Sequence, residues 1–200
     1  MISAGEGKAW EILESLDPSS VCRNASAVFD EQSHYYILRV FCTDFSVNPF
    51  EKTIKSLDPS GEIMMKKYSY FFIHSCLWYL IHAKDISLTG RLIKPVNIAG
   101  GDLFFRGSHA LPLENLAQRY KNDRETFLKK GSDLCAAELH FGDTSIQLLP
   151  FPRIPAIIIL WLQDEEFPPR ADLLLDSSCE IQLPLDIIWS LAMLSILVMM

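Results

Sequence analysis

The sequence predicts an α+β fold in which residues 1–200 form a single domain. A mixed or antiparallel sheet is expected in the second half, packed by helices from the first half and from the C-terminus. Helical signals cluster before residue 131, the hydrophobic period changes to two after it, and the last segment is apolar without interruption. The length suits one domain with its own core, and 49% hydrophobic and 22% charged residues are ordinary globular usage.

Local start and stop signals mark the helices expected in the first part of the chain. Asp17-Pro18 provides a cap followed by a first-turn proline. Asn122 and Glu125 stand at capping-box spacing, and Gly131 ends that helix. The predicted helices are Lys8–Leu16, Pro18 to about Ala27, Glu62–Ala83, Leu113–Lys121 and the segment between Asn122 and Gly131.

Extended segments are fewer in the first half. Tyr35–Phe41 is rich in aromatic and branched residues and predicts a strand, and Phe45–Val47 predicts a second one after a turn at Thr43-Asp44. Glu51–Leu57 fits neither pattern clearly. Leu103–Arg106 is a candidate extended segment.

The strand pattern dominates the second half. Glu138–Phe141 and Ser145–Leu149 flank Gly142-Asp143, which is a hairpin turn signal. Prolines make Phe151–Pro155 irregular by expectation. Ala156–Leu162 is apolar in both of its alternating sets, so it predicts a central strand covered on both faces, with Trp161 largely buried. Ala171–Leu175 predicts the next strand, and Asp186 opens a last helix.

The composition of the chain argues against some kinds of partner and predicts a cellular compartment. The net charge of -7 argues against nucleic acid and anionic membrane surfaces, which attract basic proteins. The uncharged stretch from Ile187 to the end is shorter than the roughly 20 residues of a spanning helix, so a core helix is expected and no membrane span. Five scattered cysteines without a C-x-x-C pair predict reduced, mostly buried thiols in a cytoplasmic protein.

Familiar catalytic and cofactor motifs are absent, including G-x-G-x-x-G, a Walker loop, H-E-x-x-H and G-x-S-x-G. No catalytic residue, metal ligand or cofactor is therefore predicted. His74 and His82 share a helix face with Trp78, but they are two turns apart, too far to ligate one metal ion directly. Hydrogen-bonded core or interface histidines are the favoured interpretation.

One candidate ligand site lies in the glycine-bearing stretch from Gly100 to His109. Arg106 offers a planar donor fork suited to carboxylate or phosphate, and His109 is able to titrate near neutral pH. Two adjacent phenylalanines could wall a pocket. The structural alternative is an edge strand in which one phenylalanine packs inward and Arg106 pairs with an acid.

A second candidate lies in WLQDEEFPPR, residues 161–170, where Asp164, Glu165 and Glu166 follow a strongly apolar run. Acids at the end of a buried strand oppose aggregation, and this gatekeeper role is the favoured interpretation. In an extended segment Asp164 and Glu166 would point the same way and could share a proton or a cation.

Four stretches carry a resemblance to a known family. They are HSCLWYLIHAKDISLTG, GGDLFFRGSHALPLENLAQRY, FGDTSIQLLPFPRIPAIIILWLQDEEFPPRADLLLD and the leucine-rich helix after LPLD. In this order they resemble the prokaryotic family called domain of unknown function 3786, over roughly Gln32 to the end. The family carries no assigned activity, so no catalytic residues are transferred. The resemblance implies an origin mostly among anaerobic bacteria and archaea. It also gives a weak link to corrinoid or one-carbon metabolism, through members joined to iron–sulfur domains. This chain lacks the clustered cysteines for such a cluster.

Two functional hypotheses follow. The first is a non-catalytic accessory module that binds a small anionic ligand or a partner protein. The second is an enzyme with acid–base chemistry that uses an acid among Asp164, Glu165 and Glu166 together with His109 and Arg106. A separate expectation is that Arg106 and at least one of the three acids line a common pocket.

Overall fold

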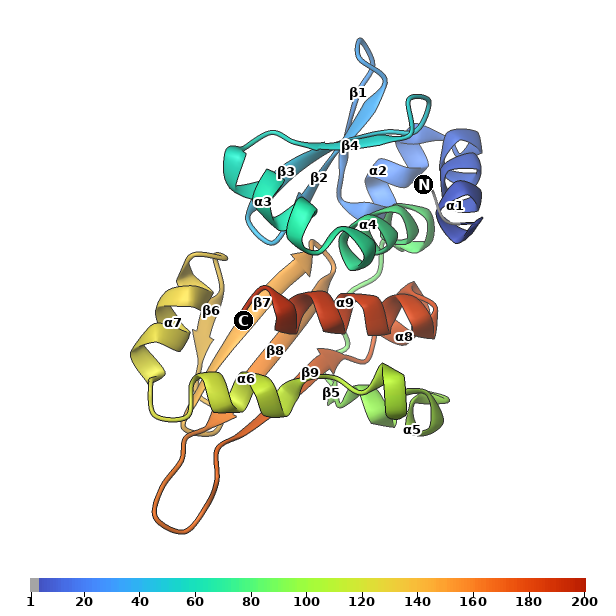
Figure 1. Ribbon diagram of the computed structural model, residues 1–200. Coiled ribbons are helices and arrows are strands. Elements are labelled where there is room, and N and C mark those ends of the chain that lie inside the picture. Colours follow the sequence, from blue (N-terminus) through green and yellow to red (C-terminus); the bar gives the residue numbers. More distant parts are fainter. Residues whose placement is uncertain (1–3) are drawn as a thin grey trace.

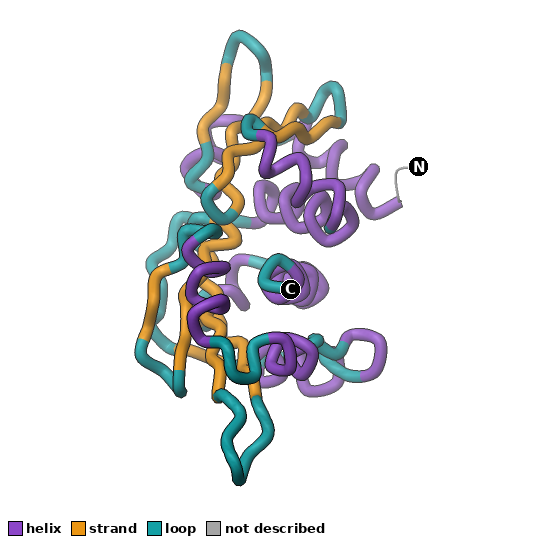
Figure 2. Tube along the Cα trace, turned by 60° about the vertical axis from the view of Figure 1, so that its left-hand side comes forward, coloured by secondary structure: helices purple, strands orange, loops and turns teal. Residues whose placement is uncertain are grey.

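Two antiparallel sheets form one layer of the molecule, and the helices α4 and α9 pack on the same side of that layer (Figures 1 and 2). The computed structural model describes residues 4–200. The α+β class predicted from the sequence is confirmed. The first half contributes a four-stranded sheet, rather than the two strands expected there, because the ambiguous segment around residue 54 and the stretch after residue 27 also become strands.

The helices of the described chain are α1 (Ala4–Ser15), α2 (Pro18–Ala25), α3 (Pro59–Lys67), α4 (Ser69–His82), α5 (Gly101–Phe104), α6 (Leu113–Arg119), α7 (Arg124–Ser132), α8 (Cys179–Gln182) and α9 (Leu185–Leu197), with short 3-10 turns at η1 (Pro95–Asn97) and η2 (Gly107–His109). The first sheet has the order β1 (Val28–Asp30), β2 (Tyr35–Val40), β3 (Thr43–Asn48), β4 (Thr53–Ser56). The second has the order β5 (Leu92–Ile93), β9 (Arg170–Asp176), β8 (Ile154–Trp161), β7 (Thr144–Phe151), β6 (Ala137–Leu139).

Strand β8 occupies the centre of the second sheet, as its apolar pattern predicts. It pairs with β7 and β9 along nearly its whole length. One set of side chains, including Ile158 and Leu160, joins the main core under the helices. The side chains on the opposite face of β8 are not all buried to the same extent. Ile157 and Ile159 are buried, whereas Trp161, which was expected to be largely buried, is only partly buried.

Two local expectations are wrong and a third holds only in part, each for a physical reason. The long helix expected over Glu62–Ala83 is divided at Tyr68, whose φ of -118° ends α3 before α4 begins. Leu103–Arg106 is not extended, because Gly100 adopts a positive φ and starts the helical turn α5. Phe151–Pro155 is irregular only at its centre, because Pro152-Arg153 form a turn while Phe151 ends β7 and Ile154 and Pro155 begin β8.

The cap of α7 is also displaced by one residue. Asp123, not Asn122, is the N-cap, and its carboxylate accepts a hydrogen bond from the amide of Thr126 at 2.9 Å. Aspartate and asparagine cap helices about equally well, so the sequence did not distinguish between the two neighbours.

Helix α9 lies between the elements of the two halves (Figure 1) and has buried side chains on most of its surface. It packs against α4, and a hydrophobic core cluster extends from Trp10 and Phe45 through α9 to Leu148. The apolar C-terminus is thus a core helix, as expected. Within residues 4–200, no helix combines the length and the hydropathy needed to cross a membrane.

The two sheets meet where the β2–β3 turn approaches the end of β7. The amide of Phe41 donates a hydrogen bond to the carbonyl of Pro150 at 3.3 Å. Phe41 itself has a φ of 53°, a rare conformation for a bulky residue, and packing in the core holds it there.

Candidate functional site

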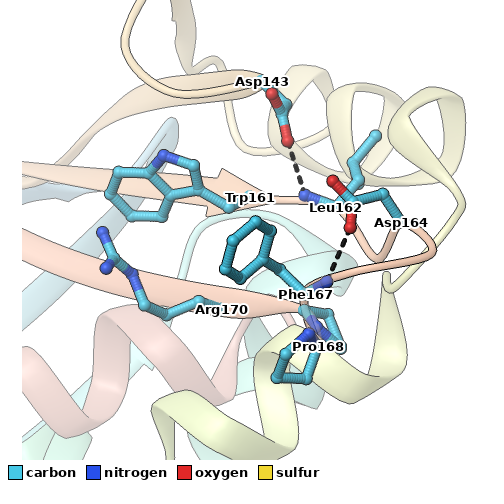
Figure 3. Close-up of a pocket in the computed structure, with 8 residues that line it drawn as sticks. Asp143, Trp161, Leu162, Asp164, Phe167, Pro168 and Arg170 are labelled. Atoms are coloured by element: carbon cyan, nitrogen blue, oxygen red, sulfur yellow. Dashed lines mark hydrogen bonds between the residues drawn. The ribbon is translucent and has the colours of Figure 1, made fainter.

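The loop between β8 and β9 extends beyond the end of the second sheet, at the bottom of Figures 1 and 2, and a cavity of about 460 Å³ opens beside it (Figure 3). That volume is within the range of small-ligand sites. The lining residues come from the loop, from the strand ends and from the β6–β7 turn: Asp143, Trp161, Leu162, Asp164, Phe167, Pro168, Pro169 and Arg170.

Asp164 shapes the loop. Its Oδ1 accepts hydrogen bonds from the amides of Glu166 at 2.8 Å and Phe167 at 2.6 Å, which is the behaviour of an aspartate in a tight turn. The amide of Asp164 donates back to the carbonyl of Phe167 at 3.1 Å, and the amide of Gln163 donates to the carbonyl of Lys121 at 2.7 Å. These hydrogen bonds fix the backbone of the loop and therefore the position from which the Phe167 side chain projects.

Trp161 forms one wall and is held from two directions. The guanidinium carbon of Arg170 lies 3.8 Å from the centre of the indole ring, on the paired strand β9. On another side lies Gly142, where a Cβ atom would come within 3.2 Å of Trp161 Cε2 and 2.7 Å of Ile159 Cγ2. Gly142 also has a φ of 58°, so the turn needs glycine for its conformation as well as for space.

Phe167 and Arg170 complete the walls (Figure 3). Phe167 is 65% exposed although it is a large apolar side chain, and it lies beside two prolines that limit the freedom of the loop. Arg170 has an ion pair with Asp172 at 3.4 Å, but its side chain is 62% exposed. Guanidinium donors are therefore open to solvent at the edge of an aromatic cavity.

The carboxylates that line the cavity, Asp143 and Asp164, accept hydrogen bonds from backbone amides. Asp143 accepts a hydrogen bond from the amide of Leu162 at 2.8 Å, and Asp164 is engaged in its own turn. Strand β8 ends at Trp161, so the alternation expected for Asp164 and Glu166 does not apply. Glu165 and Glu166 are exposed and are not among the residues that line the cavity.

The structure does not bring Arg106 or His109 into this cavity. Arg106 is exposed just before η2, and no ion pair joins it to the three acids in the described chain. His109 stacks on Phe104 with ring centres 4.5 Å apart, and its carbonyl accepts a hydrogen bond from Trp189 Nε1 at 2.9 Å. His109 thus contacts Trp189 of α9, and neither Arg106 nor His109 lines the cavity that Asp164 lines.

His74 and His82 form an aromatic row along α4. Trp78 lies between them, with ring centres 6.2 Å from His74 and 5.3 Å from His82. Burial lowers the pKa of both imidazoles, which favours their neutral form. Over residues 4–200, no group of three or more His, Cys, Asp or Glu side chains is arranged to hold a metal ion.

The strand order, the central β8 and the loop after it lie within a segment that a family model recognises. Residues 17–197 match the model described as Domain of unknown function (DUF3786). The match covers most of the chain, so the protein belongs to the family of domain of unknown function 3786. No curated protein and no solved structure matches the chain.

Sequence reasoning identified the stretch that bears the cavity but assigned its importance to other residues. The acids form the densest cluster of charge in this stretch, but of the three only Asp164 lines the cavity, whose walls are built from Trp161, Phe167 and Arg170. A signal was present, because WLQDEEFPPR places an aromatic residue and two prolines directly before an arginine. The participation of Asp143 depends on strand pairing and has no signal near residue 161.

Proposed function

We propose that the protein is a non-catalytic binding module and that the cavity beside the β8–β9 loop takes a small ligand combining an apolar ring with an acidic group. The observation that carries the proposal is the position of the solvent-open Arg170 guanidinium at the edge of a cavity walled by Trp161 and Phe167. Ligand sites in proteins are mostly apolar with a few polar groups that fix orientation.

Electrostatics favours an acidic group on the ligand. The protein carries a net charge of -7, so an anion that binds needs a local donor. A guanidinium provides paired N–H donors that match a carboxylate, sulfonate or phosphate. In this proposal Arg170 takes the role that the sequence suggested for Arg106.

The acid–base alternative has less support. An acid catalyst must reach the substrate together with its partner group. Asp143 and Asp164 hold backbone amides, and His109 is stacked against Phe104 and Trp189 away from the lining residues. A link to corrinoid or one-carbon metabolism and a cytoplasmic location stay predictions.

The proposal is tested by calorimetric titration with 2-naphthalenesulfonate and with 2-naphthol, which has a hydroxyl in place of the sulfonate. We expect the protein to bind the sulfonate more tightly than the naphthol. Phe167→Ala should weaken both about tenfold by removing one wall, and Arg170→Leu should remove the preference for the sulfonate.

Phe50→Ala is the matched control. Phe50 is also an exposed phenylalanine, at 57%, but it lies in the turn between β3 and β4. This variant should bind both probes as the parent does. Absence of binding by the parent protein, or equal binding by the parent and the Phe167 and Arg170 variants, would refute the assignment of the cavity.

A further inference from the structure

Two cysteines distant in the sequence meet at the junction of the two sheets. Cys42 lies in the turn between β2 and β3, and Cys135 lies between α7 and β6. The Cys42 thiol donates to the carbonyl of Asp133 at 3.6 Å, two residues before Cys135, and the Cys135 thiol is near enough to raise the pKa of Cys42. The neighbouring bond from Phe41 to Pro150 holds the turn that carries Cys42 in this place.

The two thiols differ in access to solvent. Cys135 is exposed, whereas Cys42 is partly buried. Burial and the hydrogen bond to Cys135 raise the pKa of Cys42 to about 11, so Cys42 is a poor first nucleophile at neutral pH. Cys135 also has a φ of 55°, so the backbone of its turn is held in the left-handed region.

Two lysines and one aspartate, Asp133, line the cavity beside the pair, so positive charge is in slight excess there although the whole protein is acidic. A cavity of about 270 Å³ beside Cys42 is lined in part by Lys67 and Lys130. The guanidinium of Arg39, which forms a 2.7 Å ion pair with Asp44, is within electrostatic range of both thiols. Cations at this place favour the approach of a reagent that carries carboxylates.

We propose that Cys42 and Cys135 form a dithiol site that closes to a reversible disulfide by exchange with a small, carboxylate-bearing disulfide. The thiolate of Cys135 attacks one sulfur of the reagent, a mixed disulfide forms, and the first reagent thiol leaves with the electron pair and takes up a proton. Cys42 then loses its proton and attacks the sulfur of Cys135, and the second reagent thiol leaves. Two protein thiols are oxidised while one external disulfide is reduced to two thiols.

The bridge would connect the two sheets covalently. Cys42 belongs to a turn of the first sheet, and Cys135 lies two residues before the edge strand β6 of the second. The remaining cysteines are less suited to exchange, because Cys76 and Cys179 are buried, Cys22 is partly buried, and burial raises the pKa of all three.

The test uses oxidised glutathione as the probe on the full-length protein, with intact-mass measurement and peptide mapping. The parent should lose two hydrogens and yield a peptide cross-linked between Cys42 and Cys135. Cys42→Ser should instead accumulate a glutathione adduct on Cys135, and Cys135→Ser should remain largely unmodified. Cys22→Ser, which changes a partly buried cysteine of α2, should form the cross-link as the parent does.

Melting curves recorded on the same samples show whether each variant is folded, so that a change in thiol reactivity is not mistaken for unfolding. The proposal is overturned if the folded parent stays reduced, if it stops at a glutathione adduct, or if a different cysteine pair is cross-linked. An adduct on Cys42 in the Cys135→Ser variant, formed as fast as that on Cys135 in Cys42→Ser, would overturn the order of attack.

Discussion

Asp176 is a carboxylate with little solvent contact, since its residue is 3% exposed. It accepts hydrogen bonds from the amide and hydroxyl of Thr89, from the amide of Gly90 and from the amide of Ser178, at 2.8 to 3.0 Å. Burial by itself raises the pKa of a carboxyl group, but these donors together lower the pKa of Asp176 to about 2. One side chain thus connects the segment before β5 to the end of β9.

The pH dependence of stability follows from this pKa. The folded value of about 2 is lower than the unfolded value of 3.8, so ionised Asp176 stabilises the fold above pH 3.8. That contribution, on the order of 2 kcal/mol, should be lost as the pH falls from 3.8 through about 2. Urea unfolding at a series of pH values should show this loss in the parent and a smaller loss in Asp176→Asn. Parallel pH profiles for the two proteins would contradict it.

Arg153 provides a second connection at the residue scale. In the turn between β7 and β8, its guanidinium donates to the carbonyl of Asn24 at 2.7 Å and to that of Arg23 at 3.0 Å, and it pairs with Asp85 at 2.6 Å. The two carbonyls belong to the last turn of α2, where a helix lacks internal donors and favours a cation. A side chain of the second sheet therefore caps a helix of the first half.

Replacing Arg153 by methionine keeps much of the apolar stem and removes the donors. We expect the free energy of unfolding to fall by about 2 kcal/mol, measured by urea denaturation. Arg91→Met is the control, because Arg91 is 73% exposed and its pair with Glu180 spans 4.0 Å. That control should change stability by less than about 0.5 kcal/mol. Equal effects of both substitutions would show that the capping contacts do not stabilise the fold.

At the scale of elements, α9 is completed by hydroxyl groups from two other helical segments. Tyr68, between α3 and α4, donates to the carbonyl of Leu197 at 2.7 Å, and Tyr120, after α6, donates to the carbonyl of Met199 at 2.5 Å. The carbonyl of Leu197 also accepts from the amide of Met200 at 3.1 Å, whereas the buried carbonyl of Met199, just after the helix, has the Tyr120 hydroxyl as its donor. The two tyrosine hydrogen bonds also fix the position of the C-terminal end of α9 relative to Tyr68, between α3 and α4, and to Tyr120, after α6.

Tyr120→Phe should therefore destabilise the protein by about 1 to 3 kcal/mol, because Met199 is buried and its carbonyl would lose a donor. The same change at Tyr70, whose residue is 60% exposed on α4, should alter stability by less than about 0.5 kcal/mol. Thermal unfolding of the two variants beside the parent decides the matter. A Tyr120 variant as stable as the Tyr70 variant would exclude this role.

The elements predicted well are those with strong local signals. The two apolar sets of β8 defined a central strand, and Asp17-Pro18 defined the start of α2, where Asp17 accepts from the amide of Ser20 at 2.9 Å. The division at Tyr68 was missed because the hydroxyl of that residue finds its partner at Leu197, far away in the sequence. Pro155 was expected to interrupt a strand, yet it lies in β8, where pairing around it continues.

At the scale of the molecule, the candidate site depends on pairings that local patterns do not contain. Trp161 faces Arg170 because β8 and β9 are antiparallel neighbours, and Asp143 reaches the cavity because β7 is paired on the other side. The sequence could locate the stretch from Trp161 to Arg170. It could not show that His109 packs against α9, since that contact depends on the position of Trp189.

The claim that Trp161 walls a ligand cavity is tested most directly by NMR of the four tryptophan side chains, Trp10, Trp78, Trp161 and Trp189. Each indole N–H gives its own signal, and a Trp161→Phe variant assigns the relevant one. During titration with 2-naphthalenesulfonate, the account predicts a saturable shift of the Trp161 signal that is reduced in Phe167→Ala, while the Trp10 and Trp78 signals stay in place. An unmoved Trp161 signal, or a shift confined to Trp189 beside His109, would contradict the cavity as the site.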